Sequence, residues 1–129
     1  MRITGPVIDT DDAVVLERFY ERPLGWEITE LEGPRPGYPP ADGWARLRSP
    51  DGDQKIEIQW EQHYVRPTWP PVPGEQQMMI HLDIAVDDLD AGLAWALEAG
   101  ATVAEHQPQE GLFVLLDPAG HPFCLFPDG

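Results

Sequence analysis

Histidine and acidic residues alternate with apolar ones along the stretch IHLDIAV, residues 80–86. In a β-strand, His81 and Asp83 would point to the same side, because alternate residues of a strand share a face. The stretch QKIEIQW, residues 54–60, would place Glu57 and Gln59 together in the same way. Imidazole and carboxylate groups bind metals, transfer protons and hydrogen-bond to ligands. His81 is therefore a metal ligand, a polar group lining a pocket, or a histidine that the fold accommodates.

The elements that must position His81 and Asp83 have the order βαβββ. Residues 79–86 alternate as a half-buried strand, and residues 87–100 change to helical spacing. Asp87 or Asp88 can cap that helix, and Gly100 is suited to its end. The sequence predicts three further strands, at residues 101–106, 111–117 and 121–126.

The first half of the chain has the same order. Residues 3–9 predict a strand weakened by Gly5 and Pro6, and residues 11–25 predict a helix with one apolar face. Three strands follow, at residues 25–32, 43–49 and 54–60. Gly5 precedes Asp12 by the same number of residues as His81 precedes Asp88, so the two halves predict a structural repeat.

The organisation predicted is a single α+β domain over residues 1–129. Residues 1–62 form its first βαβββ unit and residues 78–129 its second, with a proline-rich linker at residues 63–77. A second loop rich in proline and glycine, residues 33–43, is either a surface connection or a lid over a pocket.

Charge and composition limit the partners. Acidic residues outnumber basic ones 23 to 8, giving a net charge of −15. Such a field repels nucleic acid and anionic membranes and attracts cationic ligands. No apolar run is long enough to span a bilayer, and the first residues do not resemble a signal peptide. One cysteine, Cys124, excludes an internal disulfide, so we expect a reducing, cytoplasmic location.

Three stretches together resemble one known family: FYERPLGWEI, HLDIAVDDLDAGLAWALEAGATV and LLDPAGHPFCLF. They are similar to the vicinal oxygen chelate superfamily, which includes glyoxalases, bleomycin-resistance proteins and extradiol dioxygenases, and most of all to its glyoxalase-like subgroup. The resemblance implies that each βαβββ unit curls into a half-barrel and that the two units form a cavity. It also implies a homodimer.

The resemblance implies metal ligands on the first and last strands of each unit. His81 matches the first-strand ligand of the second unit, but Gly5 falls at its partner position and has no side chain. Glu57, with Gln59 next, matches the last strand of the first unit, and Cys124 stands where the family pattern has glutamate. His63 in the proline-rich linker and His121 in a turn expected to be exposed are weaker substitutes, and His106 is expected to be solvated. We therefore expect no metal; the alternative is Zn, Ni, Mn or Fe held by Glu57, His81 and Cys124.

We interpret the chain as a metal-independent protein that binds a small molecule, such as an antibiotic, in an aromatic and acidic cavity. Cationic or aromatic ligands fit such walls best. The residues expected to line the cavity are Trp26, Trp44, Glu57, Gln59, Trp60, His81, Asp83 and Phe113. Two alternatives stay open: a lyase, isomerase or dioxygenase that uses a divalent metal or His81 as an acid–base group, and an interaction domain without a ligand. A hydrogen bond that Glu57 accepts from His81 is a further hypothesis.

Overall fold

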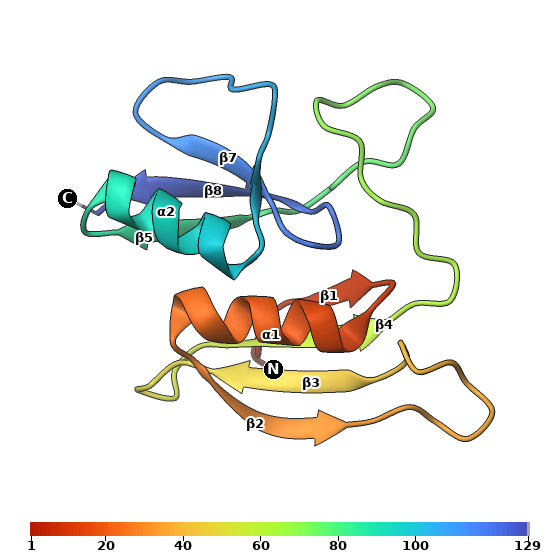
Figure 1. Cartoon of the computed structure of the whole chain (residues 1–129). Helices are drawn as coiled ribbons and strands as arrows, with labels where there is room; N and C mark the ends of the chain where they lie inside the picture. The colour runs from red at the N-terminus through yellow and green to blue at the C-terminus, as the bar shows by residue number, and fades with distance from the viewer. Residues whose placement is uncertain (129) are drawn as a thin grey trace. The chain divides into compact units, whose positions relative to one another are not determined.

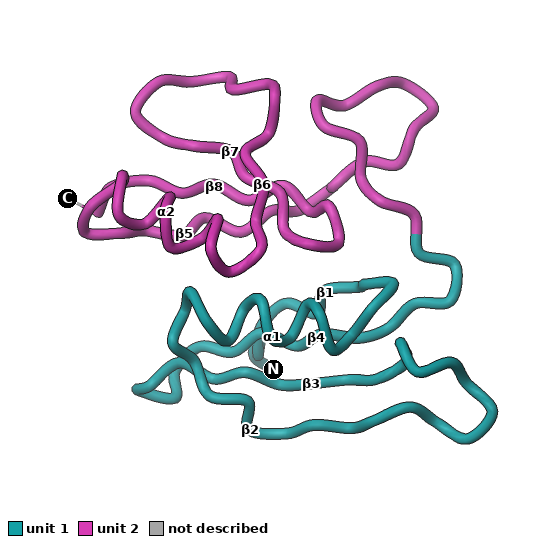
Figure 2. The backbone as a smooth tube through the Cα atoms, in the orientation of Figure 1, with its two compact units in different colours: residues 1–64 teal, residues 65–129 magenta. Residues whose placement is uncertain are grey.

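The structure is a computed structural model that describes residues 1–128. The chain divides into two compact units, residues 1–64 (unit 1) and residues 65–129 (unit 2), coloured separately in Figure 2. Each unit has the order βαβββ, which confirms the predicted α+β class and the tandem repeat. Among the described residues, no helix is long and apolar enough to cross a membrane.

Unit 1 is one helix on a four-stranded sheet (Figure 1). The sheet has the order β1-β4-β3-β2, in which β1 and β4 are parallel and the other pairs antiparallel. Its elements are β1 (Val7–Thr10), α1 (Ala13–Leu24), β2 (Glu27–Glu32), β3 (Trp44–Arg48) and β4 (Lys55–Trp60).

Unit 2 repeats this topology with the sheet order β5-β8-β7-β6. Again the first and last strands of the unit are parallel neighbours: β5 lies at the edge of the sheet, and β8 lies next to it in the interior. Its elements are β5 (Leu82–Val86), α2 (Leu89–Ala99), β6 (Thr102–Val103), β7 (Phe113–Leu116) and β8 (Pro122–Pro127).

Both helices begin on an aspartate. The Asp12 carboxylate accepts a hydrogen bond from the Val15 amide at 3.2 Å, and the Asp88 carboxylate accepts one from the Ala91 amide at 2.9 Å. Each cap satisfies an amide that has no partner within its helix. Of the two predicted caps for α2, the structure uses Asp88. Because the two caps are equivalent, they align unit 1 on unit 2.

In unit 1, one face of the sheet packs against α1. Leu47 and Ile58 from the sheet and Leu16 from the helix are all fully buried there. Alternation then turns the polar residues of β3 and β4 to the opposite face. We call this the far face, meaning the sheet face turned away from the helix of the same unit.

In unit 2, a close approach identifies the face that α2 covers. A Cβ on Gly92 of α2 would lie 2.9 Å from the Val86 side chain, so only glycine allows the helix this near to β5. The pairing register places Leu82 with Phe123 on the face of Val86. Asp83 pairs with Cys124, and both therefore lie on the far face of unit 2.

Several strands are shorter than predicted: β5 begins at Leu82, so that His81 lies just before it, and β7 covers only Phe113–Leu116. β1 begins at Val7, because Gly5 has a φ of 144° and Pro6 has no amide hydrogen to donate. β6 covers only Thr102–Val103. Beyond it, the Gln107 side chain replaces strand pairing: its amide nitrogen donates to Val114 O at 2.8 Å, and its oxygen accepts from Val114 N at 2.8 Å.

The first part of the proline-rich segment is bonded to unit 2. Arg66 donates to the Pro118 carbonyl at 2.9 Å, and the Trp69 indole donates to the His106 carbonyl at 3.0 Å. The rings of Trp69 and His106 also lie 6.0 Å apart. The segment expected to be a linker thus contributes contacts inside unit 2 from residue 66 onward.

Candidate functional site

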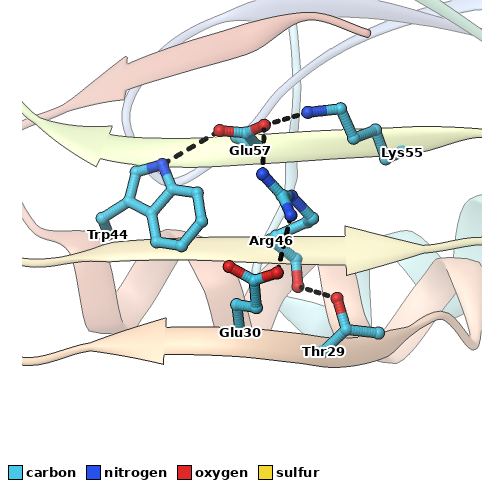
Figure 3. A network of polar contacts seen from close by, with 6 residues as sticks. All are labelled: Thr29, Glu30, Trp44, Arg46, Lys55 and Glu57. Carbon is cyan, nitrogen blue, oxygen red and sulfur yellow. Dashed lines mark hydrogen bonds and ion pairs between the residues drawn. The ribbon is translucent and has the colours of Figure 1, made fainter. Parts of the chain in front are cut away.

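The far face of unit 1 carries a polar network centred on Glu57 (Figure 3). One carboxylate oxygen accepts a hydrogen bond from the Trp44 indole at 3.1 Å. The other accepts from Lys55 and, at 3.3 Å, from Arg46. Arg46 also donates to Glu30 across the sheet at 2.6 Å. Cross-strand pairing brings these groups together, because Arg46 stands opposite both Glu30 on β2 and Glu57 on β4.

The network holds Glu57 as a carboxylate. Burial of its side chain acts to raise its pKa, but the hydrogen bond and charge of Lys55, the charge of Arg46 and the Trp44 hydrogen bond outweigh this. The pKa of Glu57 is therefore below its usual value. Both oxygens already have protein donors, so this carboxylate is not prepared to receive a metal ion.

Gly5, the other position in unit 1 that the resemblance assigns to a metal ligand, has no room for a side chain. A Cβ there would lie 2.4 Å from the Lys55 carbonyl oxygen, and its φ of 144° is unfavourable for any other residue. The metal implied by the resemblance therefore does not fit unit 1: one ligand position is sterically closed, and the other is neutralised by two cations of the chain.

A hollow of about 390 Å³ opens in unit 1 at one end of its sheet. Trp44 and Trp60 supply aromatic surface, and the Tyr38 ring packs edge-on against Trp60 at 5.9 Å. The loop at residues 33–43 supplies part of the wall. The lining residues are Glu30, Glu32, Gly33, Arg35, Asp42, Gly43, Trp44, Gln59 and Trp60.

The only cation in that lining already has a partner within the loop. Arg35 forms two side-chain hydrogen bonds with Asp42, both of 3.0 Å, and its guanidinium stacks over Tyr38 at 3.9 Å. The hydrogen bonds from Arg35 hold the pKa of Asp42 below its usual value. The lining contains three carboxylates and one guanidinium, so its formal charge is negative.

The far face of unit 2 brings together His81, Asp83 and Cys124. The Nε2 atom of His81 lies 3.1 Å from the Asp83 carboxylate. One donor atom from each of the three residues lies within 4.8 Å of the others. Burial first, and then the charge and hydrogen bonding of Asp83, raise the pKa of the Cys124 thiol. The cysteine is consequently a protonated thiol near neutral pH, and not an activated nucleophile.

These three side chains line a second hollow, of about 470 Å³. Phe126 and Leu112 give it apolar surface, and Gln109 is its remaining polar side chain. Each unit thus has a hollow of its own, one with aromatic and acidic walls and one with a histidine, a carboxylate and a thiol.

A family model described as a glyoxalase-like domain matches residues 6–126. The chain belongs to the glyoxalase-like domain family. Solved structures of the same superfamily share the fold of this glyoxalase-like domain, which confirms the resemblance seen in the sequence. No curated protein matches the chain.

Three solved structures with this fold illustrate the range of sequence identity and structural similarity to the chain. A glyoxalase family protein from Enterococcus faecalis is 23% identical, with 96% of this chain and 95% of that chain covered and a TM-score of 0.66. A glyoxalase/bleomycin resistance protein from Albidiferax ferrireducens is 19% identical, with 98% of each chain covered and a TM-score of 0.60. The fosfomycin resistance protein FosX from Listeria monocytogenes, complexed with Mn(II) and sulfate, is 11% identical, with 99% and 93% covered and a TM-score of 0.70.

Within each unit taken by itself, the structure places the predicted cavity residues of the glyoxalase-like domain as follows. Trp44, Gln59 and Trp60 line the hollow in unit 1. His81 and Asp83 line the hollow in unit 2. Glu57 lies in the polar network instead.

Two predicted aromatic residues line neither hollow. Phe113 pairs with Leu125 and so lies on the sheet face of Phe123, opposite Cys124. Trp26 is half-buried where α1 leads into β2. Strand alternation could have excluded Phe113 if the pairing register had been known. The hydrogen bond between Glu57 and His81 stays a prediction; in the structure, the His81 ring lies 3.1 Å from the Asp83 carboxylate.

The sequence reasoning missed Lys55, Arg35 and Asp42. Arg46, on the neighbouring strand, forms an ion pair with Glu57 at 3.3 Å. Lys55 could have been found from its spacing, because it is two residues before Glu57 on the same strand face. His121, expected in an exposed turn, is half-buried and lies 2.8 Å from the Asp117 carboxylate, so it is a structural residue of that turn.

Proposed function

We propose that this glyoxalase-like domain binds a small cationic, aromatic molecule in the hollow of unit 1, without a metal ion. The observation that carries the proposal is the engagement of Glu57 by Trp44, Arg46 and Lys55. Glu57, the residue of this unit that the resemblance assigns to a metal, is instead bonded to these three side chains. Affinity for a small molecule must therefore come from the walls of the hollow. Sequestration of a cationic antibiotic is one instance of such a function.

The chemistry of the walls favours a cationic ligand. Trp60, and the face of Trp44 turned away from the Arg46 guanidinium that lies 5.3 Å from its ring centre, offer flat surfaces for stacking and for cation–π contact, worth roughly 0.5–2 kcal/mol each. Glu32 is exposed at the rim, where it can pair with a positive charge. The net charge of −15 raises the local concentration of cations around the whole chain.

A thermal-shift screen tests this proposal. Cationic aromatic probes, with bleomycin as one, should raise the melting temperature, because a ligand that binds only the native state stabilises it. Neutral and anionic analogues of the same size should have little effect, and EDTA should change nothing. A shift produced only after a divalent metal is added would contradict the proposal.

Two variants locate the binding. Trp44→Leu and Glu32→Gln should each weaken the binding of the cationic probe about 5- to 30-fold, equivalent to roughly 1–2 kcal/mol. Trp95→Leu is the matched control, because Trp95 is a half-exposed tryptophan on α2 in the other unit. Equal losses in Trp44→Leu and Trp95→Leu would argue against the hollow in unit 1.

A metal-dependent lyase, isomerase or dioxygenase activity is the second candidate. The grouping of His81, Asp83 and Cys124 favours it, because these are metal-binding side chains beside a hollow. Elemental analysis of protein purified without a histidine tag separates the two candidates. Stoichiometric metal that is needed for turnover would establish the second.

We further infer, from the family resemblance, that the protein acts as a homodimer and, from its single cysteine, that it is located in the cytoplasm. Sedimentation equilibrium at several concentrations would measure the mass directly. A single monomeric species throughout would refute the dimer. Fractionation of cells that express the chain would test the location.

A further inference from the structure

The loop at residues 33–43 is anchored to the rest of unit 1 at its C-terminal end. The Ala41 carbonyl accepts a hydrogen bond from the Ala13 amide at the start of α1, at 3.1 Å. The Gly43 carbonyl accepts one from the Trp60 amide at the end of β4, at 3.0 Å. A Cβ on Gly43 would lie 3.3 Å from the Ala13 Cβ, so the backbone is closely packed there. A loop held in this way is a fixed wall of the hollow and not a lid, because a lid must be able to swing open.

Within this loop, Asp42 is bonded to a single partner, Arg35. Asp42 is 3% exposed, and its carboxylate accepts hydrogen bonds from the Arg35 amide at 2.8 Å and from the Arg35 Nε and Nη2 atoms at 3.0 Å each. Two parallel bonds to a carboxylate fix both the position and the plane of a guanidinium. Since both oxygens are engaged, Asp42 acts on the loop and not on a ligand.

The guanidinium of Arg35 in turn contacts a pair of aromatic rings. Its central carbon lies 3.9 Å from the centre of the Tyr38 ring. The Tyr38 and Trp60 rings are 5.9 Å apart, with an angle of 87° between their planes. Both are favourable geometries, the first a cation over a ring face and the second an edge-to-face pair. A chain of direct contacts therefore runs from buried Asp42 to Trp60, which lines the hollow.

We propose that Asp42 is a positioning residue: through Arg35 and Tyr38, it holds the Trp60 ring in the orientation that receives a ligand. The benefit to binding rests on the function proposed above, whereas the order of the ring does not. A wall that is ordered before binding loses less conformational freedom when the ligand arrives, so its affinity is higher.

The order of the Trp60 ring can be measured without any ligand. In ¹⁵N-labelled protein, the five tryptophan indoles should give separate signals, and Trp60→Phe identifies the one from Trp60. Asp42→Asn, Arg35→Ala and Tyr38→Leu should each lower the heteronuclear NOE of this indole, which reports motion on the picosecond-to-nanosecond timescale. Tyr38→Phe should preserve the NOE, because it keeps the ring that Trp60 contacts. Asp53→Asn, in an exposed turn of the same unit, is the matched control and should change nothing.

Arg35→Ala separates positioning from a simple effect of charge. If the walls acted only through their charge, removal of this cation would tighten the binding of acridine orange, a flat cationic dye. If Arg35 transmits the effect of Asp42, the same variant should weaken binding about 3- to 10-fold, the cost of one side chain that must be ordered on binding. The double variant Arg35→Ala/Asp42→Asn should lose no more than the weaker single variant, since residues that act in series are not additive. Fluorescence titration with the dye measures all three affinities.

Two results would overturn the proposal. The first is an unchanged NOE of the Trp60 indole in folded Asp42→Asn and Arg35→Ala, and the second is unchanged or tighter binding of the dye by Arg35→Ala. Circular dichroism establishes that each variant is folded. Because the Arg35 side chain is 58% exposed, Arg35→Ala remains informative if Asp42→Asn unfolds the protein. Failure of acridine orange to bind the wild-type protein would contradict the function proposed for unit 1, and the NOE measurements would still decide the role of Asp42.

Discussion

Units 1 and 2 share a topology but differ in the chemistry of their far faces. Aligning the helix caps matches Gly5 with His81, and the strand registers then match Glu57 with Cys124. In unit 1, Gly5 has no room for a side chain, and Glu57 is neutralised by Lys55 and Arg46. In unit 2, both positions carry side chains that can bind a metal.

The neighbours of these positions explain the difference. On the strand next to Glu57, Arg46 supplies a cation; the residue in the same place beside Cys124 is Val114. Lys55 likewise has Pro122 as its counterpart. The comparison teaches that the same backbone topology can carry two kinds of far face: a network of paired charges or a set of donors with no neighbouring cation. The presence of Arg46 and Lys55 in unit 1, in place of Val114 and Pro122, makes this difference.

The largest expected effect comes from Gly5→Ala. The new Cβ would meet the Lys55 carbonyl at 2.4 Å, in a backbone conformation that alanine rarely adopts. We expect it to cost about 3 kcal/mol or more of unfolding free energy. His81→Ala, at the equivalent position, should cost less than about 0.5 kcal/mol, because His81 is exposed. Urea unfolding measures both values, and equal losses would break the proposed correspondence.

Glu57→Gln should cost about 2 kcal/mol at pH 7, because it leaves Lys55 and part of Arg46 without their carboxylate. Cys124→Ser, the equivalent change in unit 2, should cost less, since no cation depends on that side chain in the metal-free protein. Chemical denaturation gives the two free energies of unfolding. A larger loss in Cys124→Ser would reverse the comparison.

The same carboxylate should make stability fall in acid. Since the pKa of folded Glu57 is lowered, its contribution is present above its unfolded pKa of about 4.5 and is lost as pH falls through the folded value. Unfolding free energies measured from pH 7 down to pH 3 should therefore decline less steeply in Glu57→Gln than in wild type. Parallel curves would show that the network is not coupled to protonation.

A smaller and opposite effect is expected at Glu17 on α1. Burial raises its pKa to about 7, beyond what the opposing charge of Arg18 can offset. A raised pKa favours folding at low pH, and this contribution is lost as pH rises from about 4.5 through about 7. Glu17→Gln should accordingly stabilise the protein by about 1.5 kcal/mol at pH 8 and have little effect at pH 4.

The helix alignment supplies a control for Glu17, because its counterpart on α2 is Leu93, which cannot ionise. Leu93→Met should show the same small change in melting temperature at pH 4 and at pH 8. If Glu17→Gln behaved in this pH-independent way too, the raised pKa would have no consequence for folding.

The smallest effects should be equal in the two units. Asp12→Ala and Asp88→Ala each remove one helix cap, and each should cost about 1 kcal/mol. Melting temperatures of the two variants, with Asp53→Ala in an exposed turn as the control, would test this. A markedly unequal pair would weaken the alignment on which the comparison rests.

The sequence predicted the repeated elements well, because apolar periodicity and the aspartate caps are local signals. It predicted the failure of Gly5 as a ligand for the same reason. The bonding of Glu57 to Arg46 and Trp44, and the placement of Phe113 on the face opposite Cys124, depend on strand register. Register is set by contacts between distant segments, and spacing along the chain does not contain it.

The contacts of Arg66 and Trp69 determine where the chain can be divided so that each half keeps its own bonds. A cut placed near residue 77, where the prolines end, would strip the second half of the side chains bonded to Pro118 and His106. A cut between residues 64 and 65 would keep them. If two copies of the chain exchanged halves, the hinge would therefore lie near residues 64 and 65. The rest of the proline-rich stretch would move together with unit 2, to which it is bonded.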